Sequence, residues 1–429
     1  MNLRGKTIVA DLTWTGLAFE RDVSVRVGQD GKIEQVSRDV PHDAERLEHL
    51  ALLPGMTCAH SHAFQRALRF RPERFNTGSG NFWTWRETMY RLVDELDEQS
   101  VYEISRNTFA EMLRCGVTSV GEFHYVHHGS APWSMDAAVL SAARDAGIRT
   151  SLIQCYYATG GVDQPLDGAQ KKFAAVSMPD FLLQFERLED RLDAATQSLA
   201  LSAHSIRGAS IDDIAHLHEL SLAAKIPFHI HVEEQPREIE DCVRHYGKRP
   251  LRLLLDRLKI DRNFTAIHCT HSTPDDLREL ASRGGRGCLC PSTEGNLADG
   301  IPGLRDMRQA GMRLCMGSDC NLRISMNEDL RWLEFVSRVS SQSSGIVVDE
   351  HGDPARALFE IATTGGAESL GLNRGAIGAG RQADLFALNL RHPSLIGCTP
   401  EGLLHAFIFG CGNGPVDRVW VGGSAVHTR

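Results

Sequence analysis

Two histidines one residue apart, His60 and His62, lie in the stretch PGMTCAHSHAFQ, directly after a short apolar run. On an extended chain, side chains at positions i and i+2 point to the same side. Two imidazoles on one side can share a metal ion, but they can equally be two ordinary polar residues at the end of a strand. Other parts of the sequence have to decide between these interpretations.

Further groups that could bind a metal or transfer a proton stand at the ends of other apolar runs. His231 closes PFHIH, His268 closes FTAIH and Asp319 closes CMGSD. One such residue alone is usually a loop or turn residue, but a chance occurrence at the same end of several strands is much less common. Three imidazoles with one carboxylate suit Zn²⁺, which can also hold a reactive water. Mn²⁺ and Fe²⁺ accept the same ligand types.

A carboxylate, Glu234, lies three residues after His231 in the stretch HVEEQ. A carboxylate beside a metal-activated water can remove its proton and later deliver that proton to a leaving group. The adjacent Glu233 is an obvious competitor for this role. Both could also be solvated acids at the start of a helix.

The middle of the chain predicts a scaffold that brings these distant groups together. Apolar runs of strand length alternate with amphipathic helical stretches, which indicates a parallel sheet covered on both faces. Eight such runs favour a (β/α)₈ barrel, whose catalytic residues come from the carboxyl ends of the strands. The predicted strands are LALLPGM, VTSVGEFH, RTSLIQCY, LALSAH, IPFHIH, FTAIHC, GRGCLC and RLCMGSD. The predicted helices lie near residues 98–115, 135–146, 210–224, 236–258 and 273–283.

The two ends of the chain predict a different structure. TIVADLTW, VSVRVGQDGKIEQV and ERLEHLALLP are strand candidates near the N-terminus, with a hairpin turn at Gly28–Lys32. ADLFALNL and RVWVGGSAV are strand candidates near the C-terminus. We expect the two ends to meet in one small β domain.

The composition argues against several classes of function. The 429 residues are 42% hydrophobic and 24% charged with a net charge of −9, which is typical of a globular protein without a basic surface for nucleic acid or anionic membranes. No apolar run approaches the roughly 18 residues of a membrane span, and no secretory signal is evident. The 11 cysteines form no paired CxxC framework, which predicts buried thiols in a reducing compartment. We therefore expect a cytoplasmic protein with neither nucleic acid nor membrane as a partner.

Together, these motifs resemble the amidohydrolase superfamily in its single-metal deaminase branch. PGMTCAHSH, HIHVEEQ, AIHC and GSD match its motifs at the first, fifth, sixth and eighth barrel strands, and GAIGAGRQADLFAL matches the segment that returns the chain to a β domain. The resemblance covers nearly the whole chain. It implies an α/β fold, with a (β/α)₈ TIM-type barrel over residues 53–374 and a small β-sandwich domain from residues 1–52 and 375–429.

The same resemblance implies one divalent metal ion per subunit, with Zn²⁺ favoured, and a homodimer. The implied metal ligands are His60, His62, His231 and Asp319. The implied catalytic residues are Glu234, His268 and Asp319.

Within that branch, the sequence is most similar to the formimidoylglutamate deiminases, through HSHAFQRA, FWTWRETMYR, GVTSVGEFHYVHH, CPSTEGNLADGIP and EDLRWLEF. That family hydrolyses N-formimino-L-glutamate to N-formyl-L-glutamate and ammonia in histidine degradation, so the resemblance implies a small anionic substrate. The implied substrate contacts are Gln65, Arg86, Tyr125, His204 and Arg207. The sequence departs from the family pattern in SIRGAS, in DCNLRIS and between Arg69 and Asn81, which affects the substrate assignment more than the chemistry.

Several alternatives stay open at the level of the residues. Arg86 and Arg207 suit a bidentate grip on a substrate carboxylate, but each could form a structural ion pair instead. The substrate could be another amidine, a purine such as guanine or S-adenosylhomocysteine, a related acidic formimino compound or a cyclic amide. A catalytically inactive scaffold would be marked by a missing metal ligand or a missing Glu234, and none is missing.

Three further histidines need an assignment. His271 follows His268 by three residues and could face the site in its place. We favour His268, because it lies within the apolar strand whereas His271 enters the loop. The tandem His127 and His128 are expected to be loop residues.

Overall fold

Eight parallel strands form a nearly closed barrel in the computed structural model, which describes residues 1–71 and 80–428. The strands are neighbours in chain order, and almost all of their residues are buried. The last strand closes onto the first because the Asp319 amide donates to the His60 carbonyl (3.1 Å) and the His62 amide donates to the Asp319 carbonyl (2.9 Å). The strands are β6 (Met56–Ser61), β7 (Val117–His124), β8 (Arg149–Tyr156), β9 (Gln197–Ala203), β10 (Phe228–Val232), β11 (Phe264–His268), β12 (Arg286–Leu289) and β13 (Arg313–Met316).

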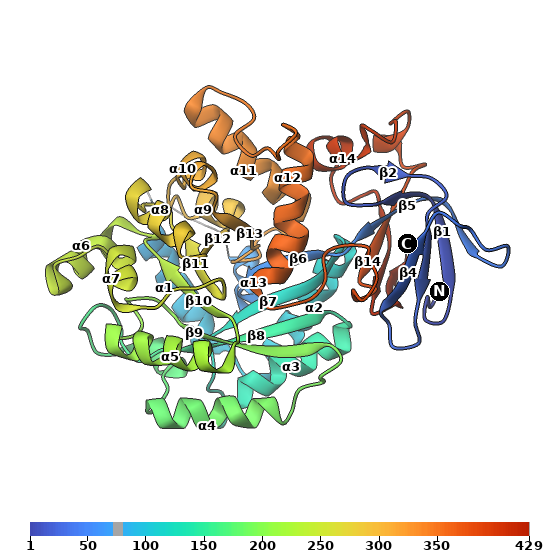
Figure 1. Ribbon diagram of the computed structural model, residues 1–429. Helices are drawn as coiled ribbons and strands as arrows, with labels where there is room; N and C mark the ends of the chain where they lie inside the picture. Colours follow the sequence, from blue (N-terminus) through green and yellow to red (C-terminus); the bar gives the residue numbers. More distant parts are fainter. Residues whose placement is uncertain (72–79, 429) are drawn as a thin grey trace.

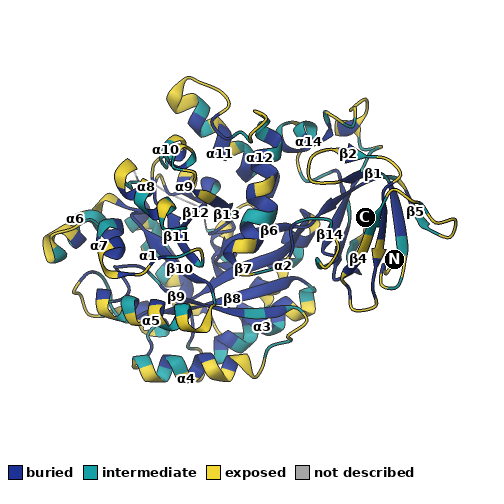
Figure 2. Cartoon of the chain, in the orientation of Figure 1, coloured by how far each residue is buried: buried dark blue, intermediate teal, exposed yellow. Residues whose placement is uncertain are grey.

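Helices cover the outside of this barrel (Figure 1). Their outward faces are exposed while the strands behind them are buried (Figure 2), as expected for a parallel sheet enclosed by helices. The α-helices are α1 (Phe82–Glu95), α2 (Glu98–Arg114), α3 (Ser134–Ala146), α4 (Met178–Glu189), α5 (Ile211–Ala224), α6 (Pro236–Tyr246), α7 (Pro250–Arg257), α8 (Pro274–Ser282), α9 (Pro291–Asn296), α10 (Leu304–Gln309), α11 (Met326–Ser341), α12 (Pro354–Glu360), α13 (Gly366–Ser369) and α14 (Leu403–His405). The 3₁₀-helical segments are η1 (Ala63–Phe70), η2 (Gly168–Lys172) and η4 (Pro393–Leu395), and the π-helical segments are η3 (Ile361–Gly365) and η5 (Ala406–Gly410).

Both ends of the chain contribute to a second sheet beside the barrel, where the two termini lie (Figure 1). The N-terminal strand β5 pairs with the C-terminal strand β14, and the amide of Leu3 donates to the carbonyl of Gly423 (2.8 Å). The sheet has its own apolar core. Its strands are β1 (Thr7–Trp14), β2 (Phe19–Glu20), β3 (Ser24–Val27), β4 (Ile33–Ser37), β5 (Glu45–Pro54), β14 (Leu385–Asn389), β15 (Val416–Val421) and β16 (Ser424–Thr428). The predicted fold class, a barrel with a companion domain from both termini, is therefore confirmed.

The structure corrects the sequence prediction at two places. The predicted helix over 236–258 is two helices, because Gly247 ends α6 with a left-handed φ of +71° and Pro250 begins α7. The apolar run LALLPGM is shared between two sheets, because β5 ends at Pro54 and the first barrel strand begins only at Met56. His60 consequently lies inside β6 and His62 just beyond it.

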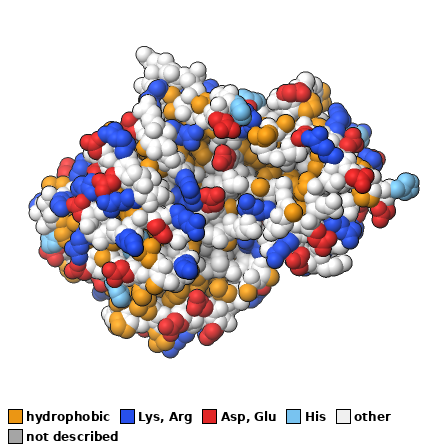
Figure 3. Space-filling view, in the orientation of Figure 1, with side chains coloured by type: hydrophobic (Ala, Val, Ile, Leu, Met, Phe, Trp, Pro, Cys, Tyr) orange, Lys and Arg blue, Asp and Glu red, His pale blue; other side chains and the backbone are white. Residues whose placement is uncertain are grey.

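The surface and the thiols agree with the composition. Acidic and basic side chains are interspersed on the face shown in Figure 3. Within the ranges that the structure describes, no helix is both long enough and apolar enough to cross a membrane. None of the 11 cysteines forms a disulfide, and all except Cys398 are buried.

Candidate active site

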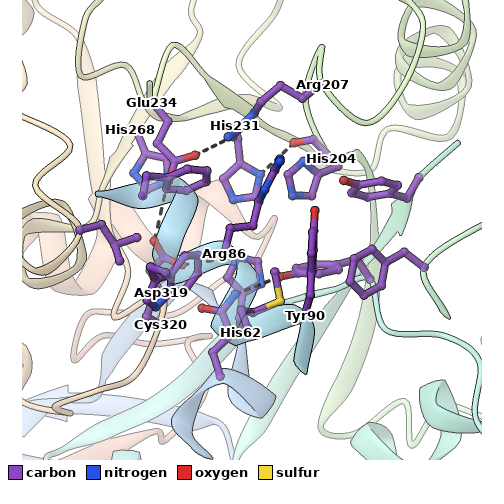
Figure 4. Close-up of a pocket in the computed structure, with 18 residues that line it drawn as sticks. His62, Arg86, Tyr90, His204, Arg207, His231, Glu234, His268, Asp319 and Cys320 are labelled. Atoms are coloured by element: carbon purple, nitrogen blue, oxygen red, sulfur yellow. Dashed lines mark hydrogen bonds and ion pairs between the residues drawn. The ribbon is translucent and has the colours of Figure 1, made fainter. Parts of the chain in front are cut away.

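A pocket opens at the carboxyl ends of the barrel strands (Figure 4) and encloses about 550 Å³, including its mouth. It contains all five predicted substrate contacts and most of the predicted metal and catalytic groups. These residues are His62, Gln65, Arg86, Tyr125, His204, Arg207, His231, Glu234, His268 and Asp319. His60 is fully buried beside them and contacts the rings of His62 and His231. Among the residues predicted to depart from the family pattern, 72–79 lie outside the described residues.

Four side chains, His60, His62, His231 and Asp319, meet at the base of this pocket, and we call them the pocket cluster. The Nε2 atoms of His60 and His231 are 3.2 Å apart, and Asp319 Oδ1 lies 3.5 Å from His60 Nε2 and 3.4 Å from His62 Nε2. A tetrahedral ion with bonds of 2.0–2.1 Å separates its ligand atoms by about 3.3 Å. The four donor atoms are therefore spaced to share one metal ion.

Hydrogen bonds on the far side of the rings orient two of these histidines, His62 and His231. His62 Nδ1 lies 2.8 Å from the Phe123 carbonyl oxygen, and His231 Nδ1 lies 2.8 Å from the His204 carbonyl oxygen. Because a carbonyl can only accept, each Nδ1 carries the proton and each Nε2 directs its lone pair at the centre of the cluster.

The protonation states of the pocket cluster also suit a metal ion. Burial lowers the pKa of His60 to about 4, which favours the neutral imidazole. Burial alone would raise the pKa of Asp319, but its interactions with His60 and the neighbouring histidines outweigh burial and hold that pKa below its usual range. Neutral imidazoles and an ionised carboxylate are the forms that bind metal. The residues therefore fit a divalent cation.

Backbone geometry at the strand ends selects Glu234 rather than Glu233. Glu233 has a left-handed φ of +51°, and its carboxylate accepts from the Leu251 amide (3.2 Å) and from Arg249 Nη2 (3.3 Å), outside the pocket. Glu234, the next residue, lines the pocket. His268 and Asp319 also have positive φ, at +70° and +47°. Each such conformation costs about 1–3 kcal/mol, and such residues cluster at functional sites.

His268 lies among three carboxylates. Its Nε2 is 3.8 Å from Glu234 Oε1 and 3.7 Å from Asp319 Oδ2, and its Nδ1 is 3.3 Å from Glu294 Oε1. Burial alone would lower the pKa of His268, but these carboxylates outweigh it and raise the pKa to about 10. His268 is therefore a cationic hydrogen-bond donor.

His271 is not among the residues that line the pocket, and its amide donates to the Glu233 carbonyl (3.2 Å).

The two pocket arginines have different surroundings. Arg86 lies on α1, which the capping box of Asn81 and Thr84 begins. Its guanidinium is 4.4 Å from the Trp83 ring centroid, and no carboxylate of the described residues forms an ion pair with it. Arg207, in contrast, donates from Nη2 to Glu234 Oε2 (2.6 Å), and its Nε lies 3.4 Å from Glu238 Oε2. Arg86 is thus a cation available to a ligand, whereas Arg207 is already paired.

Several lining residues had no assigned role in the sequence. Tyr157 and Phe173 come from loops after β8, Leu297 follows α9, and Tyr90 lies one turn after Arg86 on α1. Their types and spacing are those of ordinary core residues, so no local signal marked them. Glu294 and Glu238 were likewise missed, because their partners His268 and Arg207 are distant in the chain.

A second group of buried histidines lies between β7 and α3, and we call His124, His127 and Asp136 the outer cluster. Asp136 Oδ1 is 2.8 Å from His127 Nδ1 and 3.1 Å from His124 Nε2. These are hydrogen-bond separations, shorter than the spacing around a tetrahedral ion. His127 lies in the loop after β7, as predicted, and it is buried there as a structural residue. His128 is half-buried, with Nε2 2.8 Å from the Ala174 carbonyl oxygen.

Comparison with known sequences agrees with this geometry. The model of the amidohydrolase family matches residues 51–426. The chain is 37% identical to the formimidoylglutamate deiminase of Pseudomonas aeruginosa, over 94% of this chain and 91% of that protein. It is 27% identical to a 5-methylthioadenosine/S-adenosylhomocysteine deaminase of Moorella thermoacetica, over 89% of this chain and 82% of that protein.

Solved structures of other proteins share the fold of this chain. An amidohydrolase from Brucella melitensis superposes with a TM-score of 0.88 at 29% identity, covering 99% of this chain and 96% of that one. A zinc-bound adenosine deaminase from Xanthomonas campestris superposes with a TM-score of 0.82 at 23% identity, covering 99% of this chain and 93% of that one. At the latter identity the likeness concerns the fold alone.

Proposed function

Because this chain belongs to the amidohydrolase family, we propose that it is a metal-dependent deiminase that hydrolyses N-formimino-L-glutamate to N-formyl-L-glutamate and ammonia. This is a reaction of histidine degradation. The observation that carries the proposal is the convergence on one pocket of the pocket cluster, Glu234 and Arg86, which has no ion-pair partner among the described residues. The 37% identity to the Pseudomonas aeruginosa deiminase supports the same substrate.

We assign one divalent cation, Zn²⁺, to His60, His62, His231 and Asp319. The spacing of these donor atoms and the orientation of their lone pairs support the assignment. When bound, such an ion is a Lewis acid that lowers the pKa of a water in the site.

Glu234 is the proposed general base and acid. It takes one proton from the attacking water as the new C–O bond forms at the formimino carbon and gives that proton to the imino nitrogen. It then transfers the second proton, from the new hydroxyl group, to the same nitrogen as the carbonyl forms, the C–N bond breaks and ammonia leaves. His268 donates from Nε2–H towards the oxygen that gains charge, because its Nδ1 is held by Glu294.

Arg86, Arg207, Gln65, Tyr125 and His204 are the proposed substrate contacts. Arg86 suits a carboxylate, because its guanidinium has no acidic partner in the described part of the chain. Gln65 donates from Nε2 to the Tyr125 hydroxyl (2.9 Å), and its buried Oε1 accepts no hydrogen bond from the described residues. That oxygen can accept an N–H of the substrate.

A purine deaminase is the less well supported alternative. The 5-methylthioadenosine/S-adenosylhomocysteine deaminases are more distant relatives, at 27% identity for the Moorella thermoacetica enzyme. Two guanidinium groups in the pocket favour an anionic substrate over a neutral base.

We also propose that the enzyme is a cytoplasmic homodimer without nucleic acid or membrane partners. The net charge of −9 and the interspersed surface charges support the absence of nucleic acid and membrane partners. Light scattering on the purified protein gives the oligomeric state directly.

Ammonia release from the zinc-loaded protein tests the proposed function. N-formimino-L-glutamate should be measured beside N-formimino-L-aspartate and guanine. We expect rapid release from the glutamate compound and little from guanine. If no ammonia is released from N-formimino-L-glutamate although metal is bound, the substrate assignment is wrong, but the metal site is not affected.

A further inference from the structure

Arg207 lies between two buried carboxylates, only one of which belongs to the proposed catalytic machinery. Its Nη2 donates to Glu234 Oε2 at 2.6 Å, and its Nε is 3.4 Å from Glu238 Oε2. All three side chains are almost completely buried. The guanidinium therefore has one tight carboxylate contact and one loose contact.

The loose contact consists of two atoms without hydrogen bonds. Arg207 Nε and Glu238 Oε2 are both buried, and neither has a hydrogen-bond partner among the residues that the structure describes. A buried polar group that lacks a hydrogen bond costs about 1–3 kcal/mol. A shift of Arg207 towards Glu238 would satisfy both atoms at once.

Glu238 is fixed more firmly than Arg207. It lies in the first turn of α6, and its Oε1 accepts from the backbone amide of Glu233 at 3.0 Å. Arg207 instead lies in the loop after β9, and its guanidinium carbon is 5.3 Å from the Phe82 ring centroid. A backbone amide holds Glu238, whereas no backbone group among the described residues binds the Arg207 guanidinium, so Arg207 is the group that can move.

The tight contact opposes the proposed role of Glu234. Arg207 occupies Oε2 of Glu234, an oxygen of the carboxylate that has to take up a proton during the reaction. Glu234 therefore works best when Arg207 is withdrawn from it.

We propose that Glu238 is a positioning residue that receives Arg207 when a carboxylate ligand enters the pocket, so that Arg207 exchanges Glu234 for Glu238 and the ligand. The inference rests on the proposed function. It deepens that function by making the substrate carboxylate the group that releases the general base. A ligand without a carboxylate leaves Arg207 on Glu234, so the exchange also contributes to specificity.

Kinetics of Glu238→Gln test this exchange. The amide keeps an acceptor for the Glu233 N–H but loses the charge that attracts Arg207. We expect kcat to fall at least about tenfold with KM unchanged or lower, since the loss affects the reaction step rather than binding. Metal content and melting temperature should match those of Glu240→Gln, an exposed control on the same helix. An unchanged kcat, or a rise in KM alone, would overturn the proposal.

Crystal structures of the wild-type holoenzyme give a test that does not depend on the variant or on the substrate. Glutarate, a plain dicarboxylate, is the probe, compared with the ligand-free enzyme. We expect the Nη2–Glu234 Oε2 distance to open beyond hydrogen-bond range and the Nε–Glu238 Oε2 distance to close to about 2.9 Å. If Arg207 keeps both contacts with glutarate bound, the exchange is wrong. Failure of the wild-type enzyme to release ammonia would instead count against the proposed function.

Discussion

The pocket cluster and the outer cluster are built from the same residue types and are equally buried, yet their geometries differ. In the pocket cluster, the nearest separations of donor atoms are 3.2–3.5 Å. In the outer cluster, the corresponding separations to Asp136 are 2.8 and 3.1 Å. The first range matches ligands around a tetrahedral ion, and the second matches direct hydrogen bonds.

The partners of each cluster explain this difference. Asp136 Oδ2 accepts from the side-chain amides of Gln154 and Gln184, both at 2.9 Å, and His127 Nε2 lies 2.8 Å from the Cys155 carbonyl oxygen. Protein groups thus supply hydrogen-bond partners for both oxygens of Asp136 and both ring nitrogens of His127. In the pocket cluster, backbone carbonyls bind the outer nitrogens of His62 and His231 and leave the Nε2 lone pairs of both rings facing the centre.

The comparison shows that residue types alone do not identify a metal site. What distinguishes the two clusters is whether their donors and acceptors are complementary. Where they are complementary, the cluster is complete as a structural element. Where lone pairs converge, a cation is needed to balance them.

The largest expected effect is the loss of bound metal when a ligand of the pocket cluster is removed, an effect that no residue of the outer cluster should have. Asp319→Ala removes the carboxylate ligand, and we expect bound zinc to fall from about one to below about 0.1 ion per chain. The value of kcat/KM should fall at least about 10³-fold. Plasma mass spectrometry and ammonia release check both. Full zinc occupancy in this variant would remove Asp319 from the ligand set.

Asp136→Ala should have the opposite effect: it should destabilise the fold and leave the zinc content unchanged. It leaves His127 and two glutamine amides buried without their acceptor, so we expect a loss of about 3–5 kcal/mol in the free energy of unfolding. Zinc content and kcat per folded molecule should stay within about twofold of wild type. Urea unfolding, with the exposed Asp145→Ala on the same helix as control, measures the loss. A drop in zinc content would make the outer cluster a metal site after all.

Glu234→Ala should separate metal binding from turnover within the pocket. Glu234 is not among the proposed ligands, so zinc content should be retained while kcat falls by a factor of about 10² or more. The exposed Glu240→Ala serves as the control for steady-state kinetics. Turnover at the wild-type rate would exclude Glu234 as the general base.

Much of this architecture was predictable because its signals are local. Each barrel strand is buried on both faces and so appears as a continuous apolar run, such as VTSVGEFH for β7. The pairing of His60 with His62 follows from the alternation of side chains along a strand. Barrel topology then places His231, His268 and Asp319 beside them.

The unpredicted features depend on contacts between distant segments. His124 and His127 approach Asp136 only because α3 packs against β8, the neighbour of β7. Glu294 contacts His268 only because α9 follows β12 at the rim. The break between α6 and α7 did have a local signal, Gly247 followed by Pro250, which the strong amphipathic pattern of 236–258 obscured.

A third buried carboxyl group, Glu122, shows how the pKa of a buried acid depends on whether a cation is paired with it. Burial alone would raise the pKa of Asp136, but the charge of His127 and the hydrogen bonds of both histidines outweigh it and hold that pKa below its usual range. Glu122 lies on the same strand as His124, and it accepts from the Ala63 amide (2.6 Å) but has no cation paired with it among the described residues. Burial therefore raises the pKa of Glu122 to about 8.

The raised pKa predicts how stability depends on pH. Between about pH 4.5 and pH 8, the folded protein holds a proton on Glu122 that the unfolded chain releases. Stability from this group is complete below that window and falls as the pH rises, by up to about 1.4 kcal/mol per pH unit. Glu122→Gln is neutral at every pH, so its unfolding free energy should lack this slope, whereas the exposed control Glu103→Gln should retain it. Parallel pH profiles for wild type and Glu122→Gln would mean that Glu122 is ionised in the fold, and that burial without a cation does not distinguish it from Asp136.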